Sequence, residues 1–514
     1  MATIFKRTPE QLSERRIDPW HYQPRFERQI NKIKDNLGAL PLEAVIDSKR
    51  GVASGATPLG ANYLEKGRVK FYRTSEVEEM FLQAEEAVFI NDEDDEKLKR
   101  SRLMDGDVLL TITGAKFGKS AVVSAKHLPA NISQHSVRFK PDPKKVDAYF
   151  LVAYLNSKTG QVAIWKEAYG ATRPAIDFPS VRSLAVPKVL SLAQKYIGDK
   201  VRQAEQLRAW AKRLEHSLDA FIDHFQPEKK EYKKLFSRVP NNLLTNMLTA
   251  TTYRERYISN QKNLKAISRI QPISYYLSSI TNGYDERNEI ENGLPYVKVA
   301  NVRAGYIDLK NTPRVRLSAL TDASSKQKPE KGDLLLTRKG SFGIAAVVME
   351  SASFLCSSEV FSCKPSKPEF MPILSWFLNS EAGNMQFWQF STGTTMPGIN
   401  QENLQNILIP DFSACDIEQF NSIHKNRYEA KKNAELLTDT AKTLVEALIE
   451  GQLTEQQLIQ AQQALEDGDN SLDQAILSKL SAEGYAIEGA TPLFSDVDEL
   501  YSLLEEAAQA EAEE

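Results

Sequence analysis

The chain has few cysteines and no run of about 18 consecutive apolar residues, the length that a membrane-spanning helix needs. Its three cysteines, Cys356, Cys363 and Cys415, are too irregularly spaced for a disulfide framework or a zinc site. The N-terminal region is charged from Lys6 onward and lacks the apolar stretch of a signal peptide. These absences predict a cytoplasmic protein that has no membrane partner.

Catalytic motifs are also scarce. Residues 114–120 resemble a phosphate-binding loop, but one residue too few separates the two glycines. The corresponding segment at 340–344 has no lysine, and both segments are predicted to be tight strand connections. The histidines show no zinc-binding spacing, and the Asn/Asp-Pro-Pro-aromatic loop of a DNA-base methyltransferase is missing. We therefore expect a non-catalytic chain that itself binds no metal or cofactor.

The net charge of −3 conceals an uneven distribution of charge. Residues 451–514 contain 15 acidic side chains and one basic side chain, so residues 1–450 carry a net charge of +11. A basic body is compatible with a polyanionic partner such as DNA. Hydrophobic residues in the acidic tail predict short helices there. Three roles are open for this tail: partner docking, competition for the basic surface, or solubility.

Two segments show the apolar spacing of a coiled coil. The first predicts a helix that is about 42 Å long between residues 197 and 225, at about 1.5 Å per residue. The second lies near the end of the basic body and is its predicted partner. The predicted seam residues are Ile197, Val201, Leu207, Leu214, Leu218 and Phe221 in the first segment, and Leu437, Leu444 and Leu448 in the second.

The two halves of the chain repeat one series of motifs, and each series is followed by a long helix. Six pairs of motifs occur in the same order, at offsets of 223 to 226 residues. They include Gly-Asp-Val/Leu-Leu-Leu-Thr at 106–111 and 332–337, Leu-Asn-Ser at 155–157 and 378–380, and Gly-x-Thr-x-Pro-x-Ile at 170–176 and 393–399. The repetition predicts two tandem β-rich domains.

The order of these motifs, together with a Val/Ile-Pro strand end before each long helix, resembles the target recognition domains of Type I restriction-modification specificity subunits. The resemblance covers about residues 15–450. It implies an α+β fold with two tandem β-rich target recognition domains, separated by two long antiparallel coiled-coil helices, and a short helical acidic C-terminal tail. The implied ranges are 1–190 and 262–411 for the recognition domains, 191–226 and 412–450 for the spacer helices, 227–261 for a linker, and 451–514 for the acidic extension.

The resemblance also implies a function. In that family, each recognition domain reads one half of an asymmetric, bipartite target in double-stranded DNA. The helices dock two adenine-N6 methyltransferase subunits, which carry S-adenosylmethionine, and restriction subunits that use ATP and Mg can join the phage-defence complex. The expected chain is thus a sequence-specific DNA-binding subunit that recruits enzymes. Two alternatives are a coiled-coil scaffold of another phage-defence complex that reads no DNA sequence, and an enzyme with a divergent nucleotide site at 114–120.

DNA reading is expected from loops of each domain, because polar and cationic side chains contact base edges and phosphates. For any one of these residues, an ordinary solvated surface position is an equally good interpretation. The candidates are Lys49, Arg50, Ser54, Thr57, Arg73, Lys116, Lys119, Thr172 and Arg173 in the first domain, and Lys298, Asn301, Arg303, Arg338, Lys339, Ser341, Thr394 and Thr395 in the second.

Overall fold

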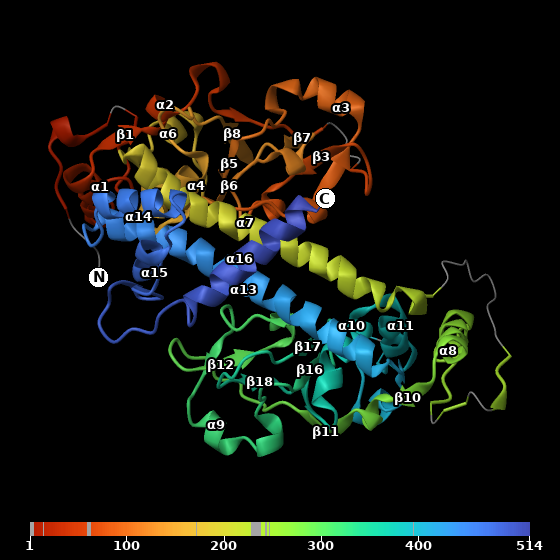
Figure 1. The fold of residues 1–514 in the computed structure, drawn as a ribbon. Helices are drawn as coiled ribbons and strands as arrows, with labels where there is room; N and C mark the ends of the chain where they lie inside the picture. Colours follow the sequence, from red (N-terminus) through yellow and green to blue (C-terminus); the bar gives the residue numbers. More distant parts are fainter. Residues whose placement is uncertain are drawn as a thin grey trace. The chain divides into compact units, whose positions relative to one another are not determined.

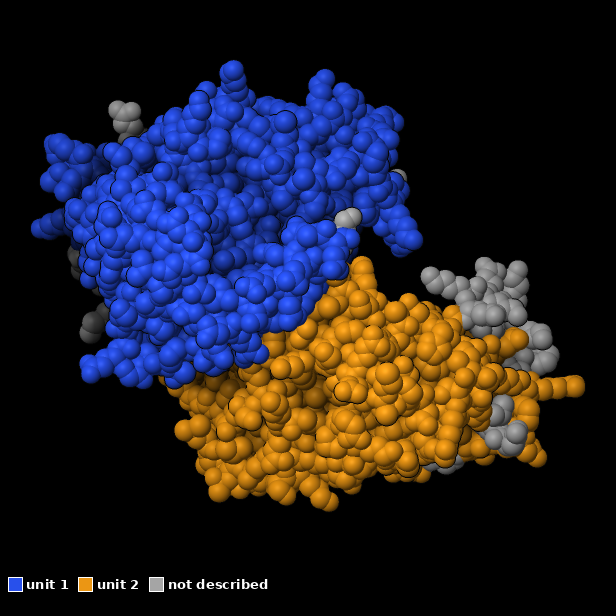
Figure 2. Space-filling model, in the orientation of Figure 1, with its two compact units in different colours: residues 1–210, 430–514 blue, residues 211–429 orange. Residues whose placement is uncertain are grey.

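The computed structural model describes residues 5–13, 15–58, 63–170, 172–227, 238–241, 244–245, 247–393 and 395–513 (Figure 1). The chain divides into two compact units: residues 1–210 with 430–514 form unit 1, and residues 211–429 form unit 2 (Figure 2). The division falls within two long helices, α7 (Ser191–Ala220) and α13 (Ala414–Ile449). Each unit therefore contains part of both helices.

The globular part of unit 1 before α7, here named copy one, contains a four-stranded and a three-stranded sheet. The four-stranded sheet has the order β2-β8-β5-β6 and is antiparallel. In the order β4-β3-β7, strand β3 runs parallel to β7, and β1 pairs separately with β9. The strands are β1 Ala39–Pro41, β2 Ala53–Ser54, β3 Val69–Tyr72, β4 Val88–Ile90, β5 Val108–Thr111, β6 Ser120–Val122, β7 Ala130–Ile132, β8 Ser136–Phe139 and β9 Ala185–Pro187.

The globular part of unit 2, here named copy two, has the same strand topology. Its sheets have the orders β11-β19-β16-β17 and β15-β12-β18, with β12 parallel to β18, and β10 pairs with β20. A small β13-β14 pair is added. The strands are β10 Ile270–Pro272, β11 Leu277–Asn282, β12 Leu294–Val297, β13 Val302–Arg303, β14 Tyr306–Ile307, β15 Arg314–Val315, β16 Leu334–Thr337, β17 Ala345–Val347, β18 Leu355–Cys356, β19 Val360–Pro365 and β20 Leu408–Pro410.

The central strand of the larger sheet is apolar at consecutive positions because both of its faces are covered. In copy two, Leu334 and Leu336 of β16 pack in one cluster with residues of α10 (Met371–Asn379). Leu335, which points to the other face, packs in a second cluster with Val297 of β12. The run of leucines therefore connects the two sheets and the helical layer of the domain.

Short helices surround the sheets of each copy. Asn156 at the end of α4 (Ala148–Asn156) donates from Nδ2 to Ser120 O of β6, at 2.8 Å. Asn379 at the end of α10 makes the same 2.8 Å bond to Ala345 O of β17. The other helices are α1 Pro24–Asn36, α2 Leu42–Val45, α3 Asp92–Lys97, α5 Lys158–Glu167, α6 Phe178–Arg182, α8 Glu255–Ile267, α9 Ala319–Asp322, α11 Glu381–Gln389 and α12 Gln401–Leu404.

The two long helices pair in an antiparallel manner. Within unit 1, Arg208 Nη2 of α7 donates to Thr438 Oγ1 of α13 at 2.6 Å. Within unit 2, Glu215 of α7 accepts from Arg427 Nη2 of α13 at 2.8 Å, so residue numbers rise along one helix as they fall along the other. The predicted seam residues are buried, except for Leu214 and Phe221, which are half-buried. The predicted fold class is thereby confirmed.

The first long helix ends earlier than its apolar spacing predicts. It stops at Ala220 and is followed by a short 3-10 helix at Asp223–Phe225. The predicted linker, residues 227–261, includes a charged run at 228–234 that lies outside the described residues. Helix α8 (Glu255–Ile267) begins within this predicted range. Among the described residues, no helix is long and apolar enough to cross a membrane.

The acidic tail is folded and belongs to unit 1. It contains helices, which confirms the prediction made for this segment. Leu458 and Leu503 of the tail are among its buried residues. Most acidic side chains of the tail are exposed, including Glu499 and Glu505, whereas Asp473 is buried. Its elements are α14 Glu455–Glu466, α15 Ser471–Leu477, β21 Leu480–Ser481, β22 Gly484–Tyr485 and α16 Val497–Ala512.

Candidate nucleic-acid interface

In copy one, residues 112–119 form the turn that connects β5 to β6. Gly114 and Gly118 have φ values of +97° and +84°, which side chains rarely adopt. A Cβ atom at Gly118 would also lie 2.8 Å from Gln161 Oε1. The segment that resembles a phosphate-binding loop therefore joins two strands, whereas that motif joins a strand to a helix. The prediction of a tight strand connection is confirmed.

The Gly-x-Thr-x-Pro-x-Ile loop of each copy is fastened to this turn. In copy one, Ile176 N donates to Ile112 O at 3.1 Å. In copy two, Ile399 N donates to Arg338 O at 2.9 Å. Bridges between Thr113 and Ala175, and between Lys339 and Gly398, complete the two attachments. A turn and a loop that are far apart in sequence thus form one surface in each copy, here named the turn-loop surface.

Two lysines of the copy-one turn are paired with one carboxylate. Lys119 Nζ lies 2.6 Å from Glu78 Oε2, and Lys116 pairs with the other oxygen of Glu78. Partial burial opposes ionisation of Glu78, but hydrogen bonds and charge from the two lysines outweigh it and lower the pKa of its carboxyl group. The pairing positions both lysines. The three side chains Lys116, Lys119 and Glu78 together keep one net positive charge.

The other candidates in copy one occupy different environments. Arg73 pairs with Glu76 at 2.7 Å and lies over the ring of Tyr63. Arg50 donates from Nε to Asp107 Oδ1 at 2.7 Å, at the end of β5 opposite to the turn. Ser54 lies half-buried on β2. The exposed candidates are Lys49, Thr57, Thr172 and Arg173.

In copy two, the turn-loop surface carries several candidates. Arg338 is half-buried, donates to Ser358 O at 3.2 Å and lies over the ring of Phe361. Lys339, Ser341 and Thr395 are exposed, and Thr394 lies outside the described residues.

Three further candidates of copy two lie around the end of β12. Lys298 is exposed and pairs with Glu289. Asn301 is buried: its Oδ1 accepts from Lys298 N at 3.1 Å, and its Nδ2 donates to Asn311 O at 3.1 Å. Arg303 is exposed on β13.

The turn-loop surfaces bring together about half of the predicted residues. Copy one contributes Lys116, Lys119, Thr172 and Arg173, and copy two contributes Arg338, Lys339, Ser341 and Thr395. Both surfaces combine cationic and hydroxyl groups, which donate hydrogen bonds to phosphates and to base edges.

One pair of residues at these surfaces is missing from the predicted set. Trp165 of α5 and Trp388 of α11 are separated by 223 positions, which is the offset between the two copies. Each ring packs edge-on against a phenylalanine of the nearby turn, Phe117 or Phe342. Their separation by the repeat offset is the sequence signal that could have identified them.

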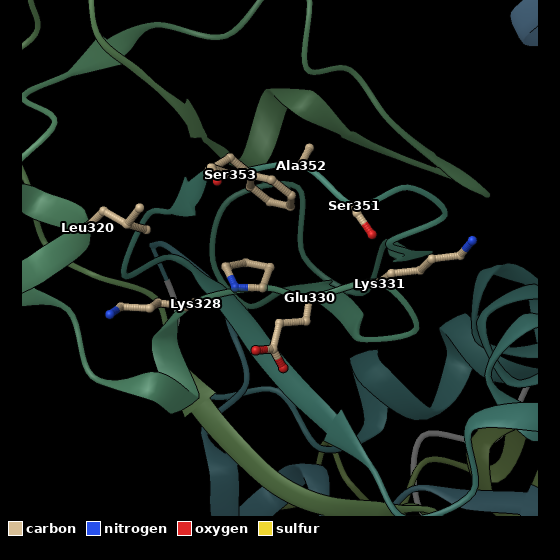
Figure 3. Close-up of a pocket in the computed structure, with 9 residues that line it drawn as sticks. Leu320, Lys328, Glu330, Lys331, Ser351, Ala352 and Ser353 are labelled. Atoms are coloured by element: carbon tan, nitrogen blue, oxygen red, sulfur yellow. The ribbon is translucent and has the colours of Figure 1, made fainter. Parts of the chain in front are cut away.

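A hollow of about 420 Å³ lies elsewhere on copy two, beside Pro329 and the buried Phe354. The charged side chains along it, Lys328, Glu330 and Lys331, point in different directions instead of converging on one point (Figure 3). Within the described ranges, no group of His, Cys, Asp or Glu side chains is arranged to hold a metal ion.

Comparisons with known proteins give one relative by sequence. No family model matches the chain. A segment of 178 residues, 35% of this chain, is 24% identical to the Type I restriction enzyme EcoBI specificity subunit of Escherichia coli. The chain spans about a third of the length of this curated relative, since the match covers 36% of it. The match agrees with the predicted resemblance, because this segment is similar to a Type I restriction enzyme specificity subunit.

Two solved structures show a more distant likeness. The S subunit of the Type I restriction-modification system from M. genitalium gives a TM-score of 0.40 at 12% identity, over 82% of this chain and 96% of that one. The HsdS subunit from Thermoanaerobacter tengcongensis gives a TM-score of 0.27 at 15% identity, over 81% of this chain and 97% of that one.

Proposed function

We propose that the chain is a sequence-specific DNA-binding subunit that recognises a bipartite, asymmetric target in double-stranded DNA. The observation that carries this proposal is the repeated topology: two copies share their sheet orders and an attached turn-loop surface, but differ in the polar residues there. A common scaffold that presents different side chains suits the reading of two different half-sites.

The same proposal assigns catalysis to other chains. In it, the subunit recruits two adenine-N6 methyltransferase subunits, which supply S-adenosylmethionine, and restriction subunits that use ATP and Mg. The antiparallel α7 and α13 supply a long apolar seam and would link the two reading modules. The chain itself contributes target selection.

The test is to map N6-methyladenine in host DNA by long-read sequencing, with this chain co-expressed with the methyltransferase encoded beside it. We expect a split, asymmetric motif that disappears when the chain is deleted. A stable complex with an active methyltransferase but no motif would refute DNA reading and favour a scaffold role. If the same methylated DNA motif is still found after this chain is deleted, the proposal is also refuted.

A further inference from the structure

In each copy, the Gly-x-Thr-x-Pro-x-Ile loop follows a helix whose last carbonyl groups need hydrogen-bond donors from outside the helix. In copy two this helix is α11, and the donors come from copy two itself. Ser391 Oγ donates to Trp388 O at 3.0 Å, and Asn403 Nδ2 of α12 donates to Phe390 O at 3.2 Å. Side chains on either side of the loop therefore hold the helix end from which the copy-two loop starts.

Copy one has different residues at the two donor positions. At the offset of 223 positions, Ala168 stands in place of Ser391, and Ser180 stands in place of Asn403. Both Ser180 and Asn403 donate their backbone N–H to the N-cap side chain of their helix, at 2.8 Å and 2.7 Å, so the two positions are structurally equivalent. Alanine has no side-chain donor, and the Ser180 hydroxyl accepts from Arg15 Nη2 at 3.4 Å. The donors for the end of α5 must therefore come from elsewhere.

Residues 15–22, here named the N-terminal segment, supply these donors. Trp20 Nε1 donates to Trp165 O at 2.7 Å, and Arg16 Nη1 donates to Glu167 O at 2.6 Å. The two acceptors are the equivalents, at the same offset, of the two carbonyl groups described in copy two. The same pair of carbonyl groups is thus hydrogen-bonded in both copies, by nearby side chains in copy two and by a distant segment of the chain in copy one.

Arg16 makes the larger share of this attachment. Its Nη2 donates to Ala168 O at 3.1 Å, and its side chain is only 14% exposed. Its position is fixed by Asp18, which accepts from Nε at 2.8 Å, and by the Tyr22 hydroxyl, which donates to Arg16 O at 2.6 Å. The guanidinium group lies at the C-terminal end of α5, where the helix dipole favours a positive charge.

We propose that Arg16 is a positioning residue for DNA reading by copy one, because it holds the loop that carries Thr172 and Arg173. This inference rests on the proposed function, in which the turn-loop surfaces read DNA. Tyr169 and Ala175 close the base of the loop, since each donates its N–H to the carbonyl group of the other at 2.9 Å. Arg16 fixes the carbonyl groups directly before this base. Copy two provides its own donors, so the N-terminal segment serves one half-site only.

The experiment measures sequence discrimination by the full chain. Discrimination is the affinity for a labelled duplex with the mapped motif, divided by the affinity for a duplex in which one half-site is replaced, and each half-site is replaced in turn. Arg16→Ala is expected to lower discrimination at one half-site about tenfold, which is within the contribution of one good base contact. Asn403→Ser gives copy two the serine of copy one and is expected to lower discrimination at the other half-site only.

The matched control is Arg28→Ala, which removes the same charge from an exposed position of α1 and is expected to discriminate as wild-type protein does. Thermal unfolding checks that every variant is folded. Unchanged discrimination in Arg16→Ala would overturn the proposal. Weaker binding to all duplexes by the same factor, with the salt slope reduced by about one unit, would also overturn it, because Arg16 would then be a phosphate contact.

A rescue separates hydrogen bonding from charge. Ser180→Asn gives copy one the donor that copy two uses, and in the Arg16→Ala background it is expected to restore most of the lost discrimination. Arg16→Lys keeps the charge but lacks the forked donors of the guanidinium group, so it is expected to restore little. Full discrimination in Arg16→Lys would overturn the hydrogen-bonding role.

Amide hydrogen exchange tests the loop without DNA. Arg16→Ala is expected to speed exchange at Tyr169 and Ala175, and to leave unchanged the amides of Thr392 and Gly398, which close the copy-two loop at 2.8 Å and 3.0 Å. Faster exchange with unchanged discrimination would overturn the proposal and leave DNA reading intact. A wild-type chain that discriminates between no duplexes would refute DNA reading, and faster exchange in Arg16→Ala would still establish that Arg16 holds the loop.

Discussion

Lys200 of α7 and Asp473 of α15 lie 273 positions apart in the sequence, yet Lys200 Nζ donates to Asp473 Oδ2 at 2.7 Å. The two side chains are only 2% and 1% exposed. The hydroxyl groups of Tyr196 and Tyr501 also donate to the Asp473 carboxylate. Burial opposes ionisation of Asp473, but these partners outweigh it and lower the pKa of its carboxyl group. The acidic extension is therefore fastened to α7 by a buried charge cluster.

Asp473→Asn is expected to loosen this attachment. The substitution preserves the size of the side chain but leaves the buried ammonium group of Lys200 without a counter-charge. Breaking a buried pair in this way costs about 3 to 5 kcal/mol of unfolding free energy. Amide hydrogen exchange is expected to show reduced protection in α14, α15 and α16. The exposed Glu488 provides a control, since Glu488→Gln changes the charge by the same amount.

Equal protection of α14–α16 in the Asp473→Asn variant and in wild-type protein would contradict this account. It would mean that apolar contacts of the extension, such as those of the buried Leu458 and Leu503, hold it without help from the ion pair.

The sequence predicted the duplicated fold well because the repeated residues have local roles. Glycine at positions 160 and 383 permits a close approach of backbone, and the apolar run in β5 and β16 follows from burial on both faces. Such roles leave the same residue at the same offset in both copies. The duplication and the two long helices could therefore be predicted from spacing, whereas the α+β class and the antiparallel pairing of the helices were implied by the family resemblance.

No repeated residue or spacing in the sequence indicated that the acidic extension attaches to α7. Lys200 and Asp473 are charged residues on amphipathic helices, and each resembles a solvated surface residue until the other is placed beside it. The candidate DNA-reading residues show the same difficulty. Arg50 pairs with the fully buried Asp107, and Asn301 holds backbone groups within copy two. Residue type indicates a possible contact with DNA, but the internal partner of each side chain depends on tertiary structure.

Acidification is expected to destabilise the protein through two buried histidines. Burial, with a smaller contribution from the charge of Lys126, lowers the pKa of His127 from 6.5 to about 3. Burial and the charge of Arg427 lower the pKa of His424 to about 4. Below pH 6.5, the unfolded chain binds protons that the folded chain does not, so stability falls as the pH falls. Each histidine contributes about 1.4 kcal/mol per pH unit in this window.

Thermal unfolding at pH 7 and at pH 5 measures this dependence. His127→Gln has no titrating group at this position and is expected to lose less stability than wild-type protein between the two pH values. His216→Gln, at an exposed position of α7, is the control and is expected to follow wild-type protein. An identical loss of stability in His127→Gln and wild-type protein would show that the His127 imidazole does not contribute to the pH dependence.

Lys49 and Arg50 are neighbours with different expected roles. Arg50 donates to both oxygens of the Asp107 carboxylate, which is fully buried, so Arg50→Ala leaves a buried charge unpaired. We expect this variant to lower the unfolding free energy by about 3 kcal/mol or more. Lys49 is exposed, and Lys49→Ala is expected to leave stability unchanged. If Lys49 contacts phosphate, this variant should weaken DNA binding and reduce the salt dependence by about one unit of slope.

The same preparations serve for both measurements. Urea denaturation gives the unfolding free energy, and fluorescence anisotropy with a labelled duplex at several salt concentrations gives the DNA affinity and its salt dependence. Thr57→Ala, at another exposed position of copy one, provides a control for stability. A stable Arg50→Ala variant with a reduced salt slope would reverse the assignment, because it would make Arg50 a DNA contact.

The length of the two paired helices is expected to set the gap between the half-sites. Inserting seven residues into α7 and seven into α13 at facing positions keeps the apolar seam in register and adds about 10 Å to each helix, at about 1.5 Å per residue. This equals about three base pairs at about 3.4 Å each. The methylation map should then show a gap wider by about three base pairs and unchanged half-sites, because both turn-loop surfaces are untouched. An unchanged gap in a folded, active variant would contradict a spacer role for the helices.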